Sequence, residues 1–75
     1  MKVLFFGALA EITGNAEMEL SGFADTALLQ QELLRRYPQL GERKFALALD
    51  KRLVRQTTVL TASSVVALLP PYSGG

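Results

Sequence analysis

The chain has 75 residues, a mass of 8.2 kDa and a formal net charge of +1, so it can hold one domain at most. Hydrophobic residues make up 49% of the sequence, which predicts a folded globular protein rather than a disordered one. The chain contains no cysteine and no histidine. This excludes disulfides, thiolate or zinc-finger sites, cysteine or histidine nucleophile systems and a histidine general base. The small net charge predicts no general attraction to nucleic acid.

The first third of the chain predicts two strands. Residues 2–8 are a run of β-branched, aromatic and aliphatic side chains, typical of a strand that is apolar on both faces. Residues 10–14 are a short connection with room for one helical turn. Residues 16–21 alternate acidic and hydrophobic side chains, as a half-buried strand does. We expect the two strands to pair as a hairpin.

A single main helix follows. Asp25 or Thr26 is a suitable N-cap, and residues 27–37 are strong helix formers. Pro38 ends the helix because proline lacks the backbone N–H and clashes with the preceding turn. The predicted core-facing stripe contains Leu28, Leu29, Leu33 and Tyr37.

The remaining chain predicts a polar loop at residues 39–44 and strands at residues 45–49, 53–55 and 65–69. Strands on either side of one helix predict an α+β fold, a mixed sheet packed on one main helix. This order of elements resembles the β-grasp roll of ubiquitin-like proteins, in which the last strand lies beside the first at the centre of the sheet. We treat residues 1–75 as a single domain with a flexible C-terminal tail at 71–75.

Strand alternation divides the sheet into two apolar faces, of which one helix can cover only one. The face expected against the helix contains Val3, Phe5, Leu47, Leu49, Val66 and Leu68. The face expected to point outward contains Leu4, Phe6, Leu53, Ala67 and Leu69. An exposed apolar cluster of this kind indicates a surface for a partner protein. Two alternatives are a strongly curled sheet and a loop at residues 56–64 that folds over this face.

The end of the sequence, Gly74-Gly75, predicts a terminus on which an enzyme acts. A carboxylate becomes a good electrophile only after activation, for example as an acyl-adenylate. Two residues without Cβ make a thin thread that fits a narrow active-site channel. Pro70 and Pro71 stiffen the segment that precedes this thread. The alternatives are a frayed polar end and a remnant of cloning.

Three segments of the sequence resemble a known family: residues 3–14, residues 48–60 and residues 65–75. Together they are similar to the small subunit of molybdopterin synthase, in the MoaD/ThiS group of ubiquitin-like sulfur carriers. The family ending is two prolines, a variable residue, Ser or Thr, and Gly-Gly. Here this ending consists of Pro70, Pro71, Tyr72, Ser73, Gly74 and Gly75.

The resemblance implies a sulfur-carrying subunit without an active site of its own. An ATP-dependent enzyme would adenylate the Gly75 carboxylate, and sulfur would replace AMP to give a thiocarboxylate. The chain would bind no cofactor and no metal, and carry only this covalent sulfur. It would donate the sulfur to cyclic pyranopterin monophosphate within a cytoplasmic heterotetramer of two small and two large subunits. The implied partner-binding residues are Phe6, Leu53, Leu69, Pro70, Pro71, Tyr72, Ser73 and Gly74.

The sequence departs from the family pattern at three places, and other functions stay open. The turn 62–64 lacks the usual glycine and acidic residue, Val65 stands where an acidic residue is common, and Asp50 stands where asparagine is usual. The alternatives are a sulfur carrier for thiamin synthesis, a protein modifier joined through Gly75 to a lysine, and an interaction module with an inert tail. A stand-alone enzyme fits the sequence least, because it has no nucleophile system, metal cluster or phosphate loop.

Overall fold

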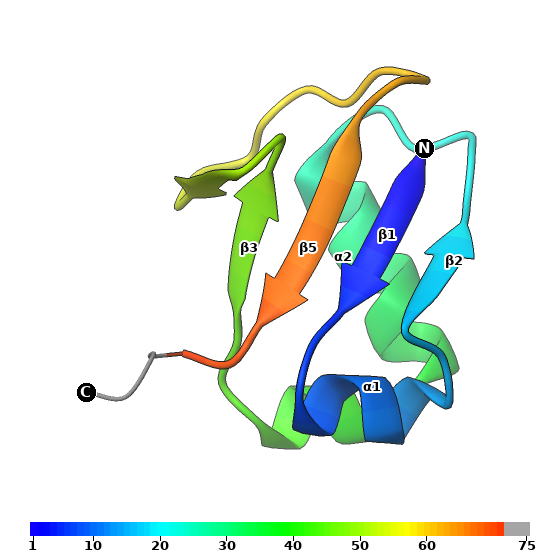
Figure 1. The fold of residues 1–75 in the computed structure, drawn as a ribbon. Helices are drawn as coiled ribbons and strands as arrows, with labels where there is room; N and C mark the ends of the chain where they lie inside the picture. The colour runs from blue at the N-terminus through cyan, green and yellow to red at the C-terminus, as the bar shows by residue number, and fades with distance from the viewer. Residues whose placement is uncertain (72–75) are drawn as a thin grey trace.

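The structure is a computed structural model that describes residues 1–71. It contains a five-stranded sheet, two α-helices and a short 3₁₀ helix (Figure 1). In chain order the elements are β1 (Lys2–Phe5), α1 (Ala8–Thr13), β2 (Glu17–Glu19), α2 (Thr26–Arg36), η1 (Pro38–Glu42), β3 (Ala46–Leu49), β4 (Arg52–Val54) and β5 (Val65–Leu69).

The sheet has the strand order β2-β1-β5-β3-β4, with the first and last strands side by side at its centre (Figure 1). β1 and β5 run parallel, and their register pairs Val3 with Val66 and Phe5 with Leu68. The other three pairs of strands are antiparallel. The predicted mixed sheet and the central position of the last strand are therefore confirmed.

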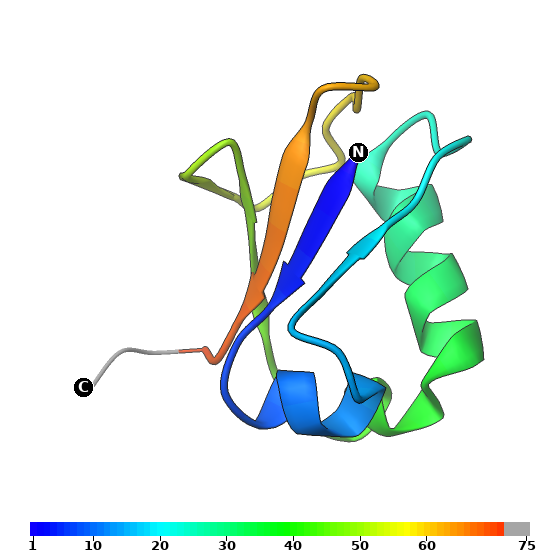
Figure 2. The same cartoon turned by 45° about the vertical axis from the view of Figure 1, so that its right-hand side comes forward.

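The sheet and α2 form two layers with the hydrophobic core between them (Figure 2). The side chains expected against the helix are found there, since the strand residues of this face are buried or pack partly on the core. The α+β assignment is confirmed, and the fold is the β-grasp. The buried core cluster consists of Val3, Phe5, Leu9, Leu29, Leu33, Leu40, Leu60, Val66 and Leu68.

Helix α2 begins and ends where the sequence predicts. The Asp25 carboxylate accepts a hydrogen bond from the backbone N–H of Leu28 at 2.9 Å and so caps the helix. The helix ends before Pro38, as expected. The expected place of Leu28 in the buried stripe is wrong, because its side chain is 45% exposed. Leu34 packs on the core instead, on the side of α2 that meets η1.

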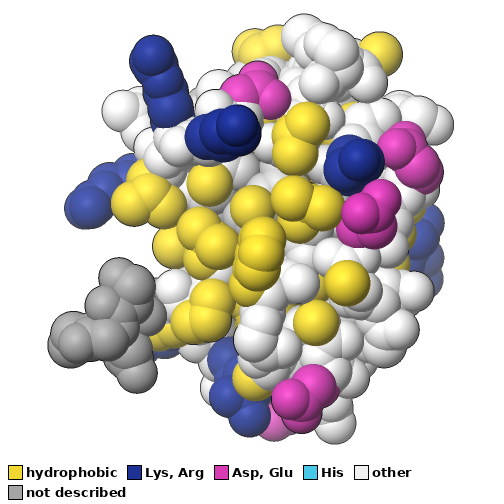
Figure 3. Space-filling view, in the orientation of Figure 1, with side chains coloured by type: hydrophobic (Ala, Val, Ile, Leu, Met, Phe, Trp, Pro, Cys, Tyr) yellow, Lys and Arg dark blue, Asp and Glu magenta, His cyan; other side chains and the backbone are white. Residues whose placement is uncertain are grey.

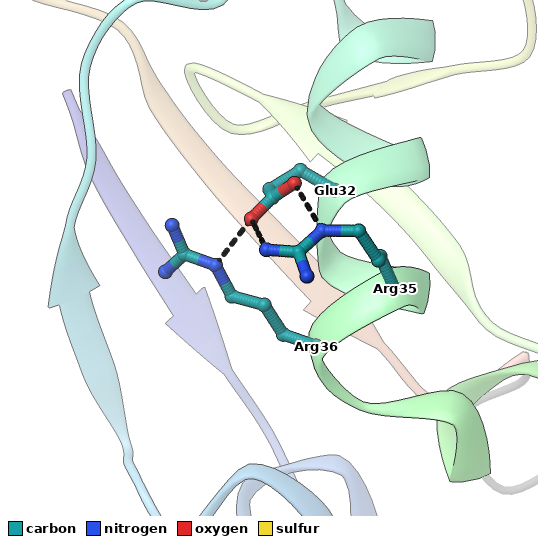
Figure 4. Close-up of polar contacts among 3 residues, drawn as sticks. All are labelled: Glu32, Arg35 and Arg36. Carbon is teal, nitrogen blue, oxygen red and sulfur yellow. Dashed lines mark hydrogen bonds and ion pairs between the residues drawn. The ribbon is translucent and has the colours of Figure 1, made fainter.

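An ion cluster lies on the last two turns of α2 (Figure 4). Glu32 accepts hydrogen bonds from Arg35 Nε and Nη2 at 2.9 and 2.7 Å, and from Arg36 Nε at 2.6 Å. These bonds stabilise the charged carboxylate, so they lower the pKa of Glu32 from 4.5 to about 2. The same contact raises the pKa of Arg35. Both arginines also lie at the helix C-terminus, where positive charge complements the helix dipole.

This cluster predicts a specific pH dependence of stability. A carboxyl group whose pKa is lowered by folding stabilises the folded state above its unfolded pKa, and this contribution is lost as pH falls toward the folded pKa. We therefore expect wild type to exceed Glu32→Gln in free energy of unfolding above pH 4.5, and the two to converge as pH falls toward about 2. Urea unfolding of both proteins across this range measures the difference. An unchanged difference at the lowest pH would contradict the assignment.

The connection between β1 and β2 differs from the sequence prediction. The strand predicted at residues 2–8 ends at Phe5, because Gly7 has φ +58° and turns the chain into α1. The two strands pair antiparallel as expected, but the connection contains a six-residue helix rather than one turn. Leu9 on this helix is buried in the core. Helix α1 therefore closes the end of the core beside the carboxyl ends of β1 and β5 (Figure 1).

The predicted polar loop at residues 39–44 is largely the 3₁₀ helix η1. Leu40 on η1 is completely buried, so this segment contributes to the core although its other residues are exposed. The predicted strands around it are correct in place but differ at their ends by one residue. The last strand has the predicted bounds.

A two-residue turn joins β3 to β4 and also contacts β5. Asp50 and Lys51 have φ values of +50° and +72°, the left-handed conformation that tight hairpins require. The Asp50 carboxylate accepts a hydrogen bond from the backbone N–H of Val65 at 3.0 Å. The Asp50 N–H donates in turn to the Val65 carbonyl at 2.8 Å. These two hydrogen bonds of Asp50 therefore fix the turn to Val65, the first residue of the central strand.

The segment at residues 56–64 lies against the start of α2. The Thr26 N–H donates to the Thr58 carbonyl, and the Leu60 N–H donates to the Ala24 carbonyl, each at 2.9 Å. Thr58 N–H also donates to Thr26 Oγ1 at 3.0 Å. Leu60 is buried in the core by these contacts. The segment thus packs beside the helix layer, and the alternative in which it folds over the outer sheet face is wrong.

Candidate partner-binding face and terminus

The outer face of the sheet carries a continuous row of apolar side chains across four strands. The registers place Leu4 beside Ala67, Ala67 beside Ala48, and Ala48 beside Leu53. Because paired residues point to the same side of a sheet, this row faces away from α2. Figure 3 shows hydrophobic side chains gathered over the middle of this face. We call this surface the outer face and define it by Leu4, Phe6, Ala46, Ala48, Leu53, Ala67 and Leu69.

The two large side chains at the sides of the outer face are open to solvent. Phe6 is 44% exposed and Leu53 is 61% exposed, although both are strongly hydrophobic. Leu69, on the strand between them, is half-buried. The small side chains of Ala46 and Ala48 leave a shallow floor between these larger groups. The outward orientation predicted for Phe6, Leu53 and Leu69 is therefore found, and the alternative of a curled sheet that hides them is not.

The outer face continues to the point where the chain leaves the sheet. The Phe6 N–H donates to the Leu68 carbonyl at 3.2 Å, which holds the end of β1 beside the end of β5. Pro70 follows β5 directly and lies over Gly7, since a Cβ on Gly7 would be only 3.3 Å from Pro70 Cγ. Both prolines are exposed. Among the predicted site residues, the structure thus brings Phe6, Leu69, Pro70 and Pro71 to one end of the sheet.

The other predicted site residues lie outside the described part of the chain. These are Tyr72, Ser73, Gly74 and Gly75, the residues of the proposed reactive terminus. Leu53 lies within the described part, two strands away from β5, and lines the same surface hollow as Pro71. Sequence reasoning did not name Ala46 and Ala48, although the alternation Ala-Leu-Ala-Leu in β3 gave the signal for them.

The buried hydroxyl groups of the described residues all serve the fold. Thr13 Oγ1 donates to the Asn15 carbonyl at 3.0 Å and stabilises the end of α1. Thr26 Oγ1 accepts from Thr58, and Ser64 Oγ accepts from the Thr61 N–H at 2.8 Å. No buried side-chain nitrogen or oxygen within residues 1–71 lacks a hydrogen-bond partner. In the same residues there is no cluster of three metal-ligating side chains, and no helix is long and apolar enough to cross a membrane.

Comparison with solved structures gives close matches over nearly the whole chain. The small archaeal modifier protein 1 of Methanosarcina acetivorans matches with a TM-score of 0.81 and 26% identity, covering 99% of this chain and 94% of that one. A putative molybdopterin converting factor subunit 1 of Pyrococcus furiosus has a TM-score of 0.81 and 24% identity, with 95% of each chain covered, and so shows the shared fold.

A third match is 30% identical. It is a protein from the complex of subunits 1 and 2 of the molybdopterin-converting factor of Helicobacter pylori, with a TM-score of 0.73 and coverage of 99% of this chain and 96% of that one. The family model of the ThiS family matches residues 3–75. The fold is thus shared by sulfur carriers and by ubiquitin-like modifiers. By sequence and by fold, the chain belongs to the ThiS family, within the MoaD/ThiS group of ubiquitin-like proteins.

Proposed function

We propose that the chain is the sulfur-carrying small subunit of a molybdopterin synthase. The observation that supports this most directly is the open apolar outer face, which continues without interruption to the base of the Gly-Gly tail. A partner bound to this face is placed to receive the tail. The Helicobacter pylori protein that is 30% identical to this chain is in complex with subunit 2 of its converting factor, which agrees with a large-subunit partner.

The proposed chemistry takes place at the Gly75 carboxylate. A carboxylate oxygen attacks the α-phosphate of ATP in an activating enzyme, and pyrophosphate leaves. A sulfide-level sulfur nucleophile then attacks the acyl-adenylate carbon and displaces AMP, which gives the thiocarboxylate. On the large subunit, the thiocarboxylate sulfur attacks a carbon of cyclic pyranopterin monophosphate and displaces an oxygen substituent from it. Water then cleaves the acyl–sulfur bond, which leaves the sulfur on the pterin and restores the Gly75 carboxylate. This chain supplies the acyl carbon and the docking surface, while the two partners supply the catalytic groups.

The proposed assembly is a heterotetramer of two small and two large subunits, with Phe6, Leu53 and Leu69 on the large-subunit interface. Pro70 and Pro71 would direct Tyr72, Ser73 and Gly74 into the large subunit's channel. We propose that the assembly is cytoplasmic, because the activation step consumes ATP. No resident cofactor or metal is assigned to the chain in this proposal.

A second candidate function is protein modification through Gly75. The small archaeal modifier protein 1 of Methanosarcina acetivorans, 26% identical to this chain, supports this alternative. A third candidate function, compatible with the ThiS family match, is that of a sulfur carrier in thiamin synthesis. All three functions start from the same activated terminus, so the fate of the acyl group separates them.

The intact mass of the protein after incubation with its activating enzyme, ATP and a sulfur donor tests the proposal. A carrier gains about 16 Da, because sulfur replaces one oxygen. Addition of the large subunit and cyclic pyranopterin monophosphate should return the mass to its starting value. A modifier is instead found joined to a lysine by an isopeptide bond. A protein whose mass never changes under these conditions would contradict both functions.

Phe6→Ala is expected to weaken binding to the large subunit by about 2 kcal/mol or more, a loss of about 30-fold in affinity. The reason is that its ring, 44% exposed in the free chain, would be fully buried by the partner. Isothermal titration calorimetry measures the affinity, and urea unfolding measures the stability of the free chain.

Leu28→Ala is the matched control for Phe6→Ala, because Leu28 is 45% exposed but lies on α2, on the opposite layer. We expect this control to bind the large subunit normally. Unchanged binding by Phe6→Ala together with a large loss of stability would move Phe6 from the interface to the core and contradict the assignment of the outer face.

A further inference from the structure

The net charge of +1 conceals a strong separation of charge along the chain. Residues 43–55 carry five basic side chains and one acidic one, a side-chain charge of +4. All other residues together carry three basic and six acidic side chains, a charge of −3. A segment of 13 residues thus holds most of the positive charge, and it contains β3, β4 and their connecting turn.

The basic side chains of this segment differ from the others in their pairing. The Nζ atom of Lys2 lies 3.8 Å from Oε2 of Glu17, and Arg35 and Arg36 form ion pairs with Glu32. By contrast, none of the five basic residues of the segment forms an ion pair with a carboxylate of residues 1–71. All five are exposed. Two of them, Lys51 and Arg52, lie in and directly after the β3–β4 turn, beside the start of β5 and so at the opposite end of that strand from the tail. We call the other three the basic crescent: Arg43, Lys44 and Arg55.

The basic crescent surrounds the place where the tail begins. Pro71 lies between two open hollows on the surface. One hollow, of about 280 Å³, is lined by Arg43 and Lys44 together with Ala8, Leu9, Pro70 and Pro71. The other, of about 470 Å³, is lined by Arg55, Leu53 and Pro71 among others. Figure 3 shows dark blue side chains at the border of the hydrophobic patch on this side, with acidic side chains both across from them and beside them.

We propose that the basic crescent binds an acidic protein surface at the entrance of the channel that receives the tail. The proposal deepens the proposed function and rests on it. Any enzyme that acts on Gly75 must approach the base of the tail, so it must also meet the crescent. These three cations pair with no carboxylate of residues 1–71 and would stay so opposite a basic or neutral surface, whereas carboxylates on the partner would pair with them. The apolar lining of the smaller hollow favours a protein segment over a free anion.

The principal consequence is a salt-dependent rate of association. Charges at the border of an interface mainly steer the encounter and change the rate constant of association. The Debye length falls from about 30 Å at 0.01 M to about 10 Å at 0.1 M ionic strength, so the attraction weakens over this range. Hydrophobic contacts of the outer face do not depend on salt in this way. The two parts of the docking surface can therefore be measured separately.

The test compares two double variants of equal net charge. The first, Lys44→Gln with Arg55→Gln, removes one cation from each hollow. The second, Gln31→Glu with Ala62→Glu, adds two negative charges at exposed positions away from the tail, on α2 and in the turn at the far end of β5. Both variants have a net charge of −1. Stopped-flow association with the activating enzyme is measured for each protein at about 0.01 M and about 0.1 M ionic strength.

We expect the first variant to associate about 10-fold more slowly than wild type at low ionic strength, and to lose most of its salt dependence. The second variant should retain at least most of the wild-type rate. Equal rates for the two variants would overturn the proposal, because net charge and not the crescent would then control association. Binding of a short single-stranded DNA in preference to the enzyme, lost in the first variant, would also overturn it and indicate a nucleic-acid site.

Failure of this proposal can be distinguished from failure of the proposed function. If the first variant binds the enzyme and acquires sulfur at the wild-type rate, the docking proposal fails and the carrier function stands. If wild type itself neither binds nor acquires sulfur, the carrier function fails and the docking proposal fails with it. Thermal unfolding of both variants checks that the fold is intact, as expected for substitutions at exposed positions.

Discussion

Removing Gly75, or adding one residue after it, is expected to abolish thiocarboxylation and leave the folded body intact. The proposed reacting atom is the last carbonyl carbon of the chain, so either change moves it by about 3.3–3.6 Å along an extended backbone. A displacement of about 1 Å in an active site can already lower a rate about 100-fold. Within residues 1–71 the buried core residues all precede Pro70, so we expect their packing to be preserved in both variants.

A thiocarboxylation assay with the activating enzyme measures this effect, with detection by intact mass. The thermal unfolding midpoint of each variant provides the control and should match that of wild type. The reaction products must also be checked for trimming of the added residue by a protease. Normal sulfur transfer by an untrimmed, extended chain would falsify the carrier mechanism.

Leu33→Ala is expected to lower the free energy of unfolding by about 2–5 kcal/mol. Leu33 is 1% exposed, in the centre of the α2 face that packs on the sheet. The substitution removes apolar contacts and leaves a cavity that the surrounding side chains fill only in part. For a domain of this size the loss is a large part of the total stability, about 0.05–0.15 kcal/mol per residue.

Urea unfolding followed by circular dichroism measures the stability of Leu33→Ala. The control is again Leu28→Ala, on the same helix but 45% exposed, for which we expect a loss below about 1 kcal/mol. If Leu33→Ala is unfolded in the absence of urea, Leu33→Met keeps the volume of the site and should lose less than about 1.5 kcal/mol. Equal effects at positions 28 and 33 would contradict the observed orientation of α2.

The sequence predicted those elements whose signals are local. Asp25 caps α2 through its own side chain, Pro38 ends it, and the alternation in β5 sets which face each residue occupies. Alternation in the first and last predicted strands likewise indicated that Phe6 and Leu69 face outward. These features depend on neighbours within a few residues, so no knowledge of the rest of the fold is needed to derive them.

The features that were missed depend on distant parts of the chain. Leu40 is a single apolar residue within a polar segment, and its burial follows from contact with α2 rather than from any periodicity. The position of residues 56–64 is set by backbone hydrogen bonds to Ala24 and Thr26, which no side-chain pattern reveals. Leu28 lies next to the row of buried residues on α2. The position of the sheet relative to the helix decides whether the side chains next to Leu29 are buried, and this position is not encoded in the helix itself.

The net charge was a poor guide to the surface because it averages over the whole chain. The spacing of Arg43, Lys44 and the three basic residues near β4 was visible in the sequence. That Arg43, Lys44 and Arg55 lie at the base of the tail follows from the antiparallel pairing of β3 with β5 and with β4, which places the start of β3 and the end of β4 at the same end of the sheet as the end of β5. Charge distribution by segment, combined with sheet topology, would have revealed the crescent.

The parallel pairing of β1 with β5 places the first and last strands side by side in the middle of the sheet. The ribosome synthesises Val3 long before Val66, so β1 cannot pair with β5 until almost the whole domain has been made. Contacts of such long sequence separation form slowly, and the core cannot close until synthesis has passed Leu69. A product that stops earlier lacks the central strand and is exposed to proteolysis. Only chains whose translation has reached the point where the tail begins can therefore fold.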